Sequence, residues 1–225
     1  MREYPANDAG APTLVFGHGA GAGEEHPWIV RVARDLAAHG VRVVTFNFPY
    51  RAEGRKLPDK PPVLEAAFQA AWNEVVAADR KSGRADAPYF AGGKSMGARI
   101  ASQAAARRLL SPAPAGLVFF GYPLHPPGKP GQRRDAHLPD IVAPMLFLHG
   151  TRDPFGSPDE MRELTLGASA RAKRATLEVI DGGDHSLIAP KSKDPKSLER
   201  AITFAANWIV SVSQARSTPE VDLRD

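Results

Sequence analysis

The sequence predicts an α/β protein, a three-layer α/β/α sandwich built on a mostly parallel sheet of about six to seven strands. Short runs rich in Val, Leu and Phe alternate along the chain with amphipathic segments. This alternation is typical of a parallel sheet whose strands are connected by helices. The apolar runs are continuous, as expected of strands that are buried on both faces.

Six apolar runs are predicted to form strands. They span residues 14–16, 41–46, 88–92, 117–120, 145–148 and 177–180. Between them, apolar residues recur at helical spacing and predict five helices. These helices span residues 28–39, 64–75, 98–110, 157–167 and 194–212.

Terminal signals support several of these helices. Pro27 is suited to a first helical position, and Gly40 to the stop after the last turn. The segment Ser157-Pro158-Asp159-Glu160 has the pattern of a capping box, and Gly167 is suited to end the helix that follows it.

The composition argues against several classes of partner. The 29 basic and 25 acidic residues give a net charge of +4 and are scattered along the chain, so we expect no nucleic-acid partner. No apolar run approaches the roughly 18 residues of a membrane span, so we expect no membrane partner. The chain contains no Cys, which excludes disulfides and cysteine nucleophiles. The seven His residues lack the spacing of a ligand pair, so we expect no metal.

Residues 1–213 are expected to form one domain. The periodicity is lost from Gln214, and residues 214–225 are therefore expected to form a C-terminal tail. The N-terminal segment is polar and lacks the apolar stretch of a secretory signal, which favours a cytoplasmic protein. No pattern in the sequence indicates an oligomeric state.

The segment Gly93-Lys94-Ser95-Met96-Gly97 matches the pattern G-x-S-x-G. A predicted strand runs directly into it and a predicted helix leaves it, which is the setting of a nucleophile elbow. In such a turn the serine is strained and exposed, and the start of the helix favours a developing negative charge. Ser95 is therefore the candidate nucleophile, and the alternative is a Gly-rich turn with an idle serine.

A hydroxyl nucleophile needs a general base, and His185 is the best-placed candidate. It lies in Asp181-Gly182-Gly183-Asp184-His185-Ser186, directly after the last predicted strand, where a Gly-rich loop would let it reach a neighbouring strand end. The weaker alternatives are His26, His39, His125, His137 and His149. Of these, His149 is expected to make a structural hydrogen bond and His26 to cap a helix.

The imidazole in turn needs an orienting carboxylate. Asp153 follows the predicted strand 145–148 and is the candidate. The alternatives are Asp140 and Asp159. Ser95, Asp153 and His185 each follow a predicted strand, in that chain order. Because the carboxyl ends of parallel strands share one edge of the sheet, we expect the three side chains to converge there.

A Gly-rich segment, Gly17-His18-Gly19-Ala20-Gly21-Ala22-Gly23, follows the first predicted strand. Its alternate glycines leave backbone N–H groups accessible, as an oxyanion hole requires. Gly-rich turns between strand and helix also bind nucleotides, but the dinucleotide pattern G-x-G-x-x-G fails in every register. The Walker pattern fails as well, because its leading glycine would fall on Pro88. We therefore expect no nucleotide and no other cofactor.

In combination, the motifs GHGAGAG, GKSMG, HGTRDPFG and GGDHS resemble those of the α/β-hydrolase superfamily, from Thr13 to about Val212. The segments FNFPY (46–50) and GYPLHPPGKP (121–130) are similar to a branch of small hydrolase-like proteins without a cap domain. That branch includes testis-expressed animal proteins and a subunit of the chromatin-associated NSL acetyltransferase complex. Dienelactone-hydrolase-like enzymes are a neighbouring group, but they use a cysteine nucleophile, which this chain lacks.

The resemblance implies an α/β-hydrolase fold and a serine hydrolase that cleaves an ester, thioester or related acyl bond of a small molecule. Ser95 would attack the carbonyl carbon and His185 would take its proton, while Asp153 orients the imidazole. The backbone N–H groups of Met96 and Ala20 would bind the oxyanion.

Loops expected to rim the site supply candidate substrate contacts. The candidate contacts are His18, Tyr50, Arg51, Lys94, Tyr122, His125 and Arg133. The loops 47–60 and 121–138 each carry a net charge of +2, which indicates either recognition of an anionic substrate group or an ordinary solvated surface. The arginines of these loops that are candidates for such recognition are Arg51, Arg55, Arg133 and Arg134.

The length of the chain leaves no room for a lid domain. The Pro-rich loop over residues 122–138 is therefore expected to determine specificity. We expect a shallow, open site that accepts a small or flexible acyl group.

A second function is a non-catalytic interaction module that keeps the fold, as the relative in the chromatin complex suggests. A scaffold under no chemical demand would be expected to lose part of the site. The complete set of Ser95, Asp153, His185 and both oxyanion loops therefore favours the enzyme.

Overall fold

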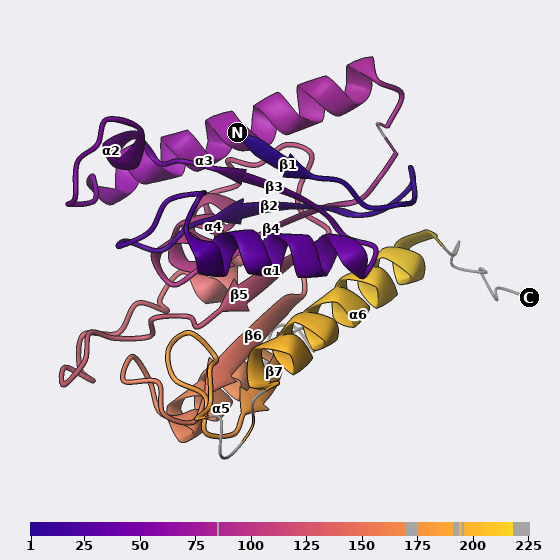
Figure 1. The fold of residues 1–225 in the computed structure, drawn as a ribbon. Helices are drawn as coiled ribbons and strands as arrows, with labels where there is room; N and C mark the ends of the chain where they lie inside the picture. The colour runs from indigo at the N-terminus through magenta and orange to yellow at the C-terminus, as the bar shows by residue number, and fades with distance from the viewer. Residues whose placement is uncertain (85, 170–174, 191–193, 195, 218–225) are drawn as a thin grey trace, which may run out of the picture.

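The computed structural model covers residues 1–225 and describes all of them except 85, 170–174, 191–193, 195 and 218–225. Within the described residues, seven strands form one sheet in the order β1-β3-β2-β4-β5-β6-β7 (Figure 1). The edge strand β1 runs antiparallel to β3, and all other neighbouring strands are parallel. The strands are β1 (Arg2–Tyr4), β2 (Thr13–Gly17), β3 (Arg42–Phe46), β4 (Tyr89–Lys94), β5 (Gly116–Phe120), β6 (Met145–Gly150) and β7 (Ala175–Ile180).

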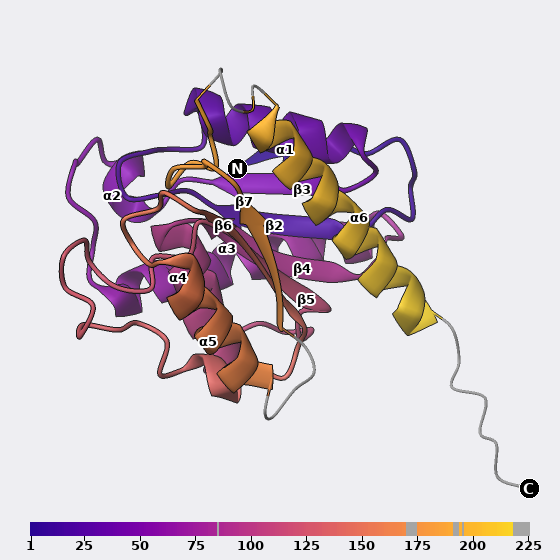
Figure 2. The same cartoon turned by 90° about the horizontal axis from the view of Figure 1, so that it is seen from below.

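Helices cover both faces of the sheet (Figure 2). Two of them lie on one face, α1 (Pro27–Ala38) and α6 (Ser197–Ser217). Three lie on the other face, α3 (Pro61–Lys81), α4 (Met96–Ala106) and α5 (Pro158–Ser169). The short helix α2 (Pro49–Ala52) follows β3, and the 3-10 helix η1 (Leu138–Asp140) precedes β6. This arrangement confirms the predicted three-layer α/β class.

Each face of the sheet contributes to its own hydrophobic core, because successive side chains of a strand point to opposite faces. Leu14 and Phe16 of β2 belong to the core shared with α1 and α6, whereas Val15 belongs to the core shared with α3 and α4. All five residues of β2 are buried, which explains why its sequence is continuously apolar. None of the described helices combines the length and apolar character that a membrane crossing requires.

The sequence did not predict strand β1. Arg2 and Glu3 are polar and exposed, and an edge strand of three residues leaves no apolar run to detect. At the other end of the chain, α6 continues to Ser217, beyond the expected start of the tail at Gln214. The helix is extended past its apolar stripe by backbone hydrogen bonding, which needs no apolar side chain. The remainder of the expected tail lies outside the described residues.

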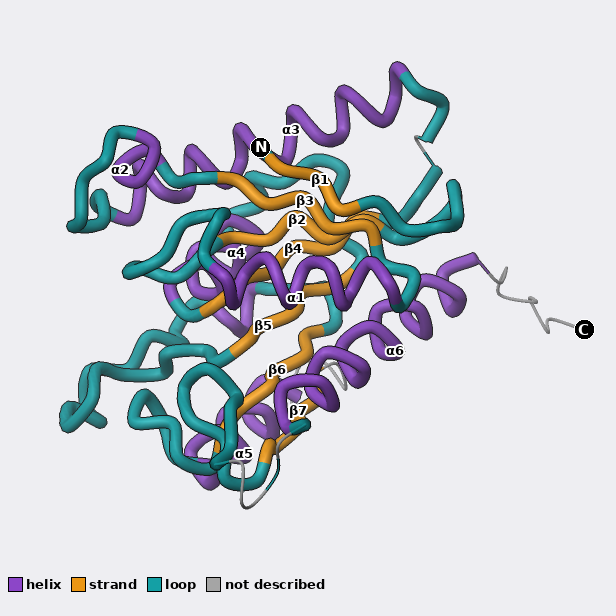
Figure 3. Tube along the Cα trace, in the orientation of Figure 1, coloured by secondary structure: helices purple, strands orange, loops and turns teal. Residues whose placement is uncertain are grey.

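The carboxyl ends of the parallel strands lie along one edge of the sheet, and long loops gather there (Figure 3). The loops after β2, β4, β6 and β7 carry the residues that the sequence singles out, as the shared direction of these strands requires. The fold therefore brings four segments that are distant in sequence to one edge.

Helix α4 approaches strand β2 closely at its first turn. A Cβ atom on Gly97 would overlap the carbonyl group of Gly17, at the end of β2, and a Cβ atom on Gly93 would overlap the same carbonyl oxygen. Only glycine leaves room for this contact between backbones. The contact fixes the start of α4 beside the Gly-rich loop that follows β2.

Replacing Gly97 with Ala should therefore destabilise the fold. We expect Gly97→Ala to lower the free energy of unfolding by about 1 to 3 kcal/mol, the typical effect of overpacking, because the clash is with backbone atoms. Gly131→Ala is the matched control, since no atom lies within 4 Å of a Cβ atom at Gly131. Urea unfolding followed by circular dichroism measures both, and equal midpoints for the two variants would contradict the close-contact argument.

Candidate active site

Ser95 lies in the tight turn between β4 and α4. Its backbone has a φ of 53° and a ψ of −111°, a conformation that residues other than glycine rarely adopt. The turn is held by the hydrogen bond from the Ser95 N–H to the carbonyl of Phe120 and by the close contact of Gly93 and Gly97 with β2. This conformation places the hydroxyl group at the start of α4, at the carboxyl edge of the sheet.

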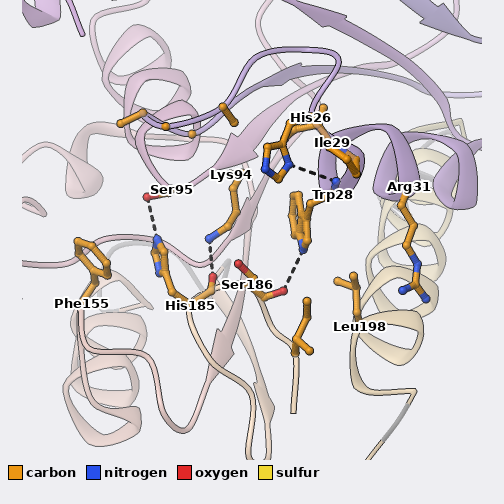
Figure 4. Close-up of a pocket in the computed structure, with 16 residues that line it drawn as sticks. His26, Trp28, Ile29, Arg31, Lys94, Ser95, Phe155, His185, Ser186 and Leu198 are labelled. Carbon is orange, nitrogen blue, oxygen red and sulfur yellow. Dashed lines mark hydrogen bonds between the residues drawn. The ribbon is translucent and has the colours of Figure 1, made fainter. Parts of the chain in front are cut away.

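The imidazole of His185 reaches this hydroxyl group. His185 Nε2 lies 2.8 Å from Ser95 Oγ, within hydrogen-bonding distance (Figure 4). The ring of Phe155 is tilted against the imidazole, with 4.3 Å between the ring centroids. The contact limits the rotation of the imidazole and shields one of its faces from water.

Asp153 binds the other nitrogen of the imidazole. His185 Nδ1 donates a hydrogen bond to Asp153 Oδ2 over 2.7 Å, and the Phe155 N–H donates one to Oδ1 over 2.9 Å. The carboxylate is inaccessible to solvent. Burial acts to raise the pKa of Asp153, but the hydrogen bond and charge of His185 and the N–H of Phe155 outweigh it, and the pKa is lowered. The residue is therefore an anion that can stabilise a protonated His185.

Two side chains hold the loop that carries His185. The Lys94 ammonium donates to the carbonyl of His185, and the Trp28 indole N–H donates to the carbonyl of Ser186 over 3.0 Å (Figure 4). The loop also approaches β6 closely, since a Cβ atom on Gly150 would overlap the carbonyl of Gly183. The sequence favoured a mobile Gly-rich loop, whereas these contacts fix the imidazole beside Ser95.

Two backbone N–H groups of the loops beside Ser95 are left without an acceptor. Among the described residues, the N–H groups of Met96 and Ala20 have no hydrogen-bond acceptor. The Ala20 loop is held from behind, because the Tyr50 hydroxyl donates to the carbonyl of Ala20 over 2.8 Å. His18 Nε2 accepts the Phe48 N–H over 3.1 Å, while its Nδ1 donates to the adjacent carbonyl of Gly19. The loop is thus shaped with donors available to an anion.

A pocket of about 740 Å³ opens from Ser95. It runs past Lys94 and Trp28 toward the start of α6, with Arg31 at its far end (Figure 4). Its apolar walls are formed by Trp28, Ile29, Phe155, Ile188 and Leu198. The side chains that shape it come mainly from α1 and the loop after β7.

A family model described as an alpha/beta hydrolase domain matches residues 10–214. The chain belongs to the alpha/beta hydrolase family. The matched residues include all four loops that carry the site.

Solved structures share the alpha/beta hydrolase fold over nearly the whole chain. A putative alpha/beta hydrolase from Agrobacterium tumefaciens is 15% identical, covers 97% of this chain and 93% of its own, and has a TM-score of 0.73. Dienelactone hydrolase from Anabaena variabilis is 20% identical, with coverages of 93% and 89% and a TM-score of 0.68. Thermogutta terrifontis esterase 2, phosphorylated by paraoxon, is 16% identical, with coverages of 93% and 87% and a TM-score of 0.70. At these identities the likeness establishes the fold.

The structure brings Ser95, His185 and Asp153 of this alpha/beta hydrolase together, as their positions after three strands predicted. The expected roles of two other histidines match their contacts. His149 Nε2 donates to the carbonyl of Gly156 over 2.8 Å, and His26 Nδ1 accepts the N–H of Trp28 at the start of α1. In the part of the chain that is described, no group of three or more His, Asp or Glu side chains is arranged to hold a metal ion.

Of the seven expected substrate contacts, only Lys94 is among the described residues that line the pocket. His18 and Tyr50 hold the Ala20 loop from behind. The pocket lining also lacks the remaining four expected contacts, which are Arg51, Tyr122, His125 and Arg133. Arg55 and Arg134 do not line the pocket either. None of the four arginines expected to recognise an anionic substrate group therefore lines this pocket.

The Pro-rich loop over residues 122–138 does not line the pocket, contrary to the prediction that it determines specificity. Its side chains bond to one another and to α5. The Tyr122 hydroxyl donates to the carbonyl of Arg134 over 2.7 Å, and His125 Nε2 lies 3.3 Å from the Glu160 carboxylate. These contacts draw the loop toward α5 and away from the pocket.

Sequence reasoning missed Trp28, which forms a wall of the pocket and holds the loop after β7. A signal was present, because Pro27 and Trp28 stand at a predicted helix start a few residues after the Gly-rich loop. A large aromatic residue at that position lies at the same sheet edge as Ser95. Phe155 was equally detectable, since it follows Asp153 by two residues.

The buried imidazole of His18 should make stability depend on pH. Burial lowers its pKa to about 4, whereas the pKa of a histidine in an unfolded chain is ~6.5. Protonation below pH ~6.5 therefore favours the unfolded chain, and the stability that neutral His18 provides is lost as the pH falls toward 4.

We expect the loss of unfolding free energy between pH 7.5 and pH 4.5 to be about 2 to 3 kcal/mol smaller in His18→Gln than in the wild type. Urea unfolding at the two pH values measures this difference. All other titratable groups are present in both proteins, so their contributions cancel in the comparison. The same pH dependence in both proteins would show that His18 does not remain neutral in the fold.

Proposed function

We propose that this alpha/beta hydrolase is a serine hydrolase that cleaves a carboxylic ester, thioester or related acyl bond through an acyl-enzyme. The observation that carries the proposal is the continuous chain of hydrogen bonds from Asp153 through His185 to Ser95, over 2.7 Å and 2.8 Å. A buried carboxylate, an imidazole and a hydroxyl in this order can activate the hydroxyl as a nucleophile.

The proposed reaction uses this geometry in two stages, acylation and deacylation of Ser95. Ser95 Oγ attacks the carbonyl carbon while its proton passes to His185 Nε2. The imidazolium that forms is stabilised by the Asp153 carboxylate. His185 then protonates the leaving group, and the carbonyl re-forms as an acyl ester on Ser95. A water molecule, deprotonated by the same imidazole, hydrolyses that ester and restores the free hydroxyl.

The oxyanion of the tetrahedral intermediates is assigned to the N–H groups of Met96 and Ala20. Neither group has an acceptor among the described residues, and Met96 is the first residue of α4, whose N-terminus carries a partial positive charge. Tyr50 holds the carbonyl of Ala20 and so fixes the direction of the loop. Donors that are oriented in advance stabilise developing charge without reorganising during the reaction.

The alternative role, a non-catalytic interaction module of the branch that includes the chromatin-complex subunit, gains no specific support. A scaffold has no need of a strained serine or of a loop held at two consecutive carbonyls. Hydrolysis of a small acyl substrate, without a cofactor and within the cytoplasm, remains the proposal that accounts for these features.

Loss of any member of the hydrogen-bonded chain should abolish turnover. We expect Ser95→Ala and His185→Ala to lower kcat by about 10⁶-fold, and Asp153→Asn by about 10⁴-fold, as in other serine hydrolases. Labelling with a fluorophosphonate probe and hydrolysis of p-nitrophenyl acetate measure the effect. Ser102→Ala is the control, because the Ser102 hydroxyl is buried in α4 and bonds to the carbonyl of Arg99. Labelling that persists in Ser95→Ala, or is absent from the wild type, would refute the proposed function.

A further inference from the structure

The side chains that line the pocket carry only positive charge. Lys94 and Arg31 are both among them, and no described lining residue is acidic. The remaining walls are mostly apolar and therefore screen these charges poorly. The pocket is suited to an anionic group carried on a largely apolar chain.

The Lys94 ammonium forms no ion pair with a described residue, although the Asp153 and Asp184 carboxylates act on it from beyond 4 Å. The residue is 8% exposed, and its Nζ donates to the carbonyl of His185 and lies 5.7 Å from the centre of the Trp28 ring. No described carboxylate lies within 4 Å of it. An ammonium group has three N–H donors, and buried charges are normally paired. Lys94 therefore has both the charge and the free donors to bind an anion.

The position of Lys94 places that anion beside the reacting groups. A Cβ atom on Gly121 would lie 3.1 Å from Lys94 Nζ and 3.3 Å from His185 Cε1, so the ammonium and the imidazole border the same point. Arg31, in contrast, is half-exposed at the outer end of the pocket and lies 3.5 Å from Asp35. An exposed and paired guanidinium attracts anions only weakly. Lys94 is the stronger of the two anion sites.

We propose that the substrate carries a carboxylate on its acyl part, which pairs with Lys94 when the carbonyl carbon lies at Ser95. This inference rests on the proposed function and adds the substrate class. The His185 carbonyl accepts one N–H group of the Lys94 ammonium. A carboxylate matches the site because its two oxygens can accept hydrogen bonds from the remaining N–H groups. A phosphate would call for several converging donors, and the lining offers one buried cation.

Matched esters test the proposal. The charged probe is the mono-4-nitrophenyl ester of adipic acid, and the neutral probe is its methyl ester, which has the same chain. Adipate is chosen because the shorter succinate and glutarate monoesters release nitrophenol by intramolecular attack. We expect the wild type to prefer the charged probe by about tenfold to a hundredfold in kcat/KM, the usual effect of a hydrogen bond to a charged group.

Variants separate recognition from support of the loop. Lys94→Met should lower the hydrolysis of both esters through loss of the contact with the His185 carbonyl, but should lower that of the charged ester further and so abolish the preference. Lys94→Arg should restore part of the preference. Lys81→Met is the control, since it removes the same charge from an exposed position at the end of α3 and should keep the preference. An equal loss of activity on both probes in Lys94→Met would show that Lys94 only holds the His185 loop, and would overturn the proposal.

The wild type alone provides a second test. Burial lowers the pKa of Lys94 to about 8, although the Asp153 and Asp184 carboxylates oppose that shift. Because kcat/KM reports the free enzyme, the charged-to-neutral ratio should fall as the pH rises through 8. Any group that acts on both probes alike cancels in the ratio. A ratio near one at pH 7 would refute the carboxylate, whereas no Ser95-dependent hydrolysis of the neutral ester would refute the proposed function itself.

Discussion

The site depends on one close contact between backbones, that of the Gly17 carbonyl with Gly93 and Gly97. It fixes the end of β2 against the start of α4, and so determines the distance between the Gly-rich loop and the turn that carries Ser95. Strain in that turn persists because the surrounding sheet and helix leave the chain no other path. The hydroxyl group of Ser95 and the two loops that carry the unbonded N–H groups of Met96 and Ala20 are thereby held next to each other before any substrate binds.

The imidazole is positioned by a different means, through the carbonyl groups of its own loop. His185 and Ser186 each have their carbonyl bound by a side chain from another element, Lys94 at the end of β4 and Trp28 of α1. Asp153 then needs to supply only orientation and charge. Its carboxylate is inaccessible to water, so its attraction for an imidazolium is weakly screened. The His149 ring, kept neutral by burial, packs behind it with Nδ1 3.7 Å from the carboxylate and adds no competing cation.

Sequence reasoning succeeded where a short motif determines geometry by itself. The alternation of apolar runs predicted the parallel sheet, and strand direction then predicted that Ser95, Asp153 and His185 would converge. It failed for the walls of the pocket. Charge on a loop does not reveal which way the loop folds, and the Pro-rich segment folds toward α5 because His125 faces Glu160 there. Trp28 was missed because its pocket role depends on the path of a loop 158 residues away in sequence.

A cation beside the imidazole has a consequence for the proposed reaction. When His185 accepts the proton of Ser95, two positive charges lie close together, because Lys94 Nζ and the imidazole both border the Cβ position of Gly121. At such separations their repulsion amounts to about 1 to 4 kcal/mol, depending on how much water remains. A carboxylate on the substrate neutralises Lys94 and removes this repulsion at the moment the imidazolium forms. The interaction is then stronger in the transition state than in the ground state, so a carboxylate-bearing substrate gains in kcat and not in affinity alone.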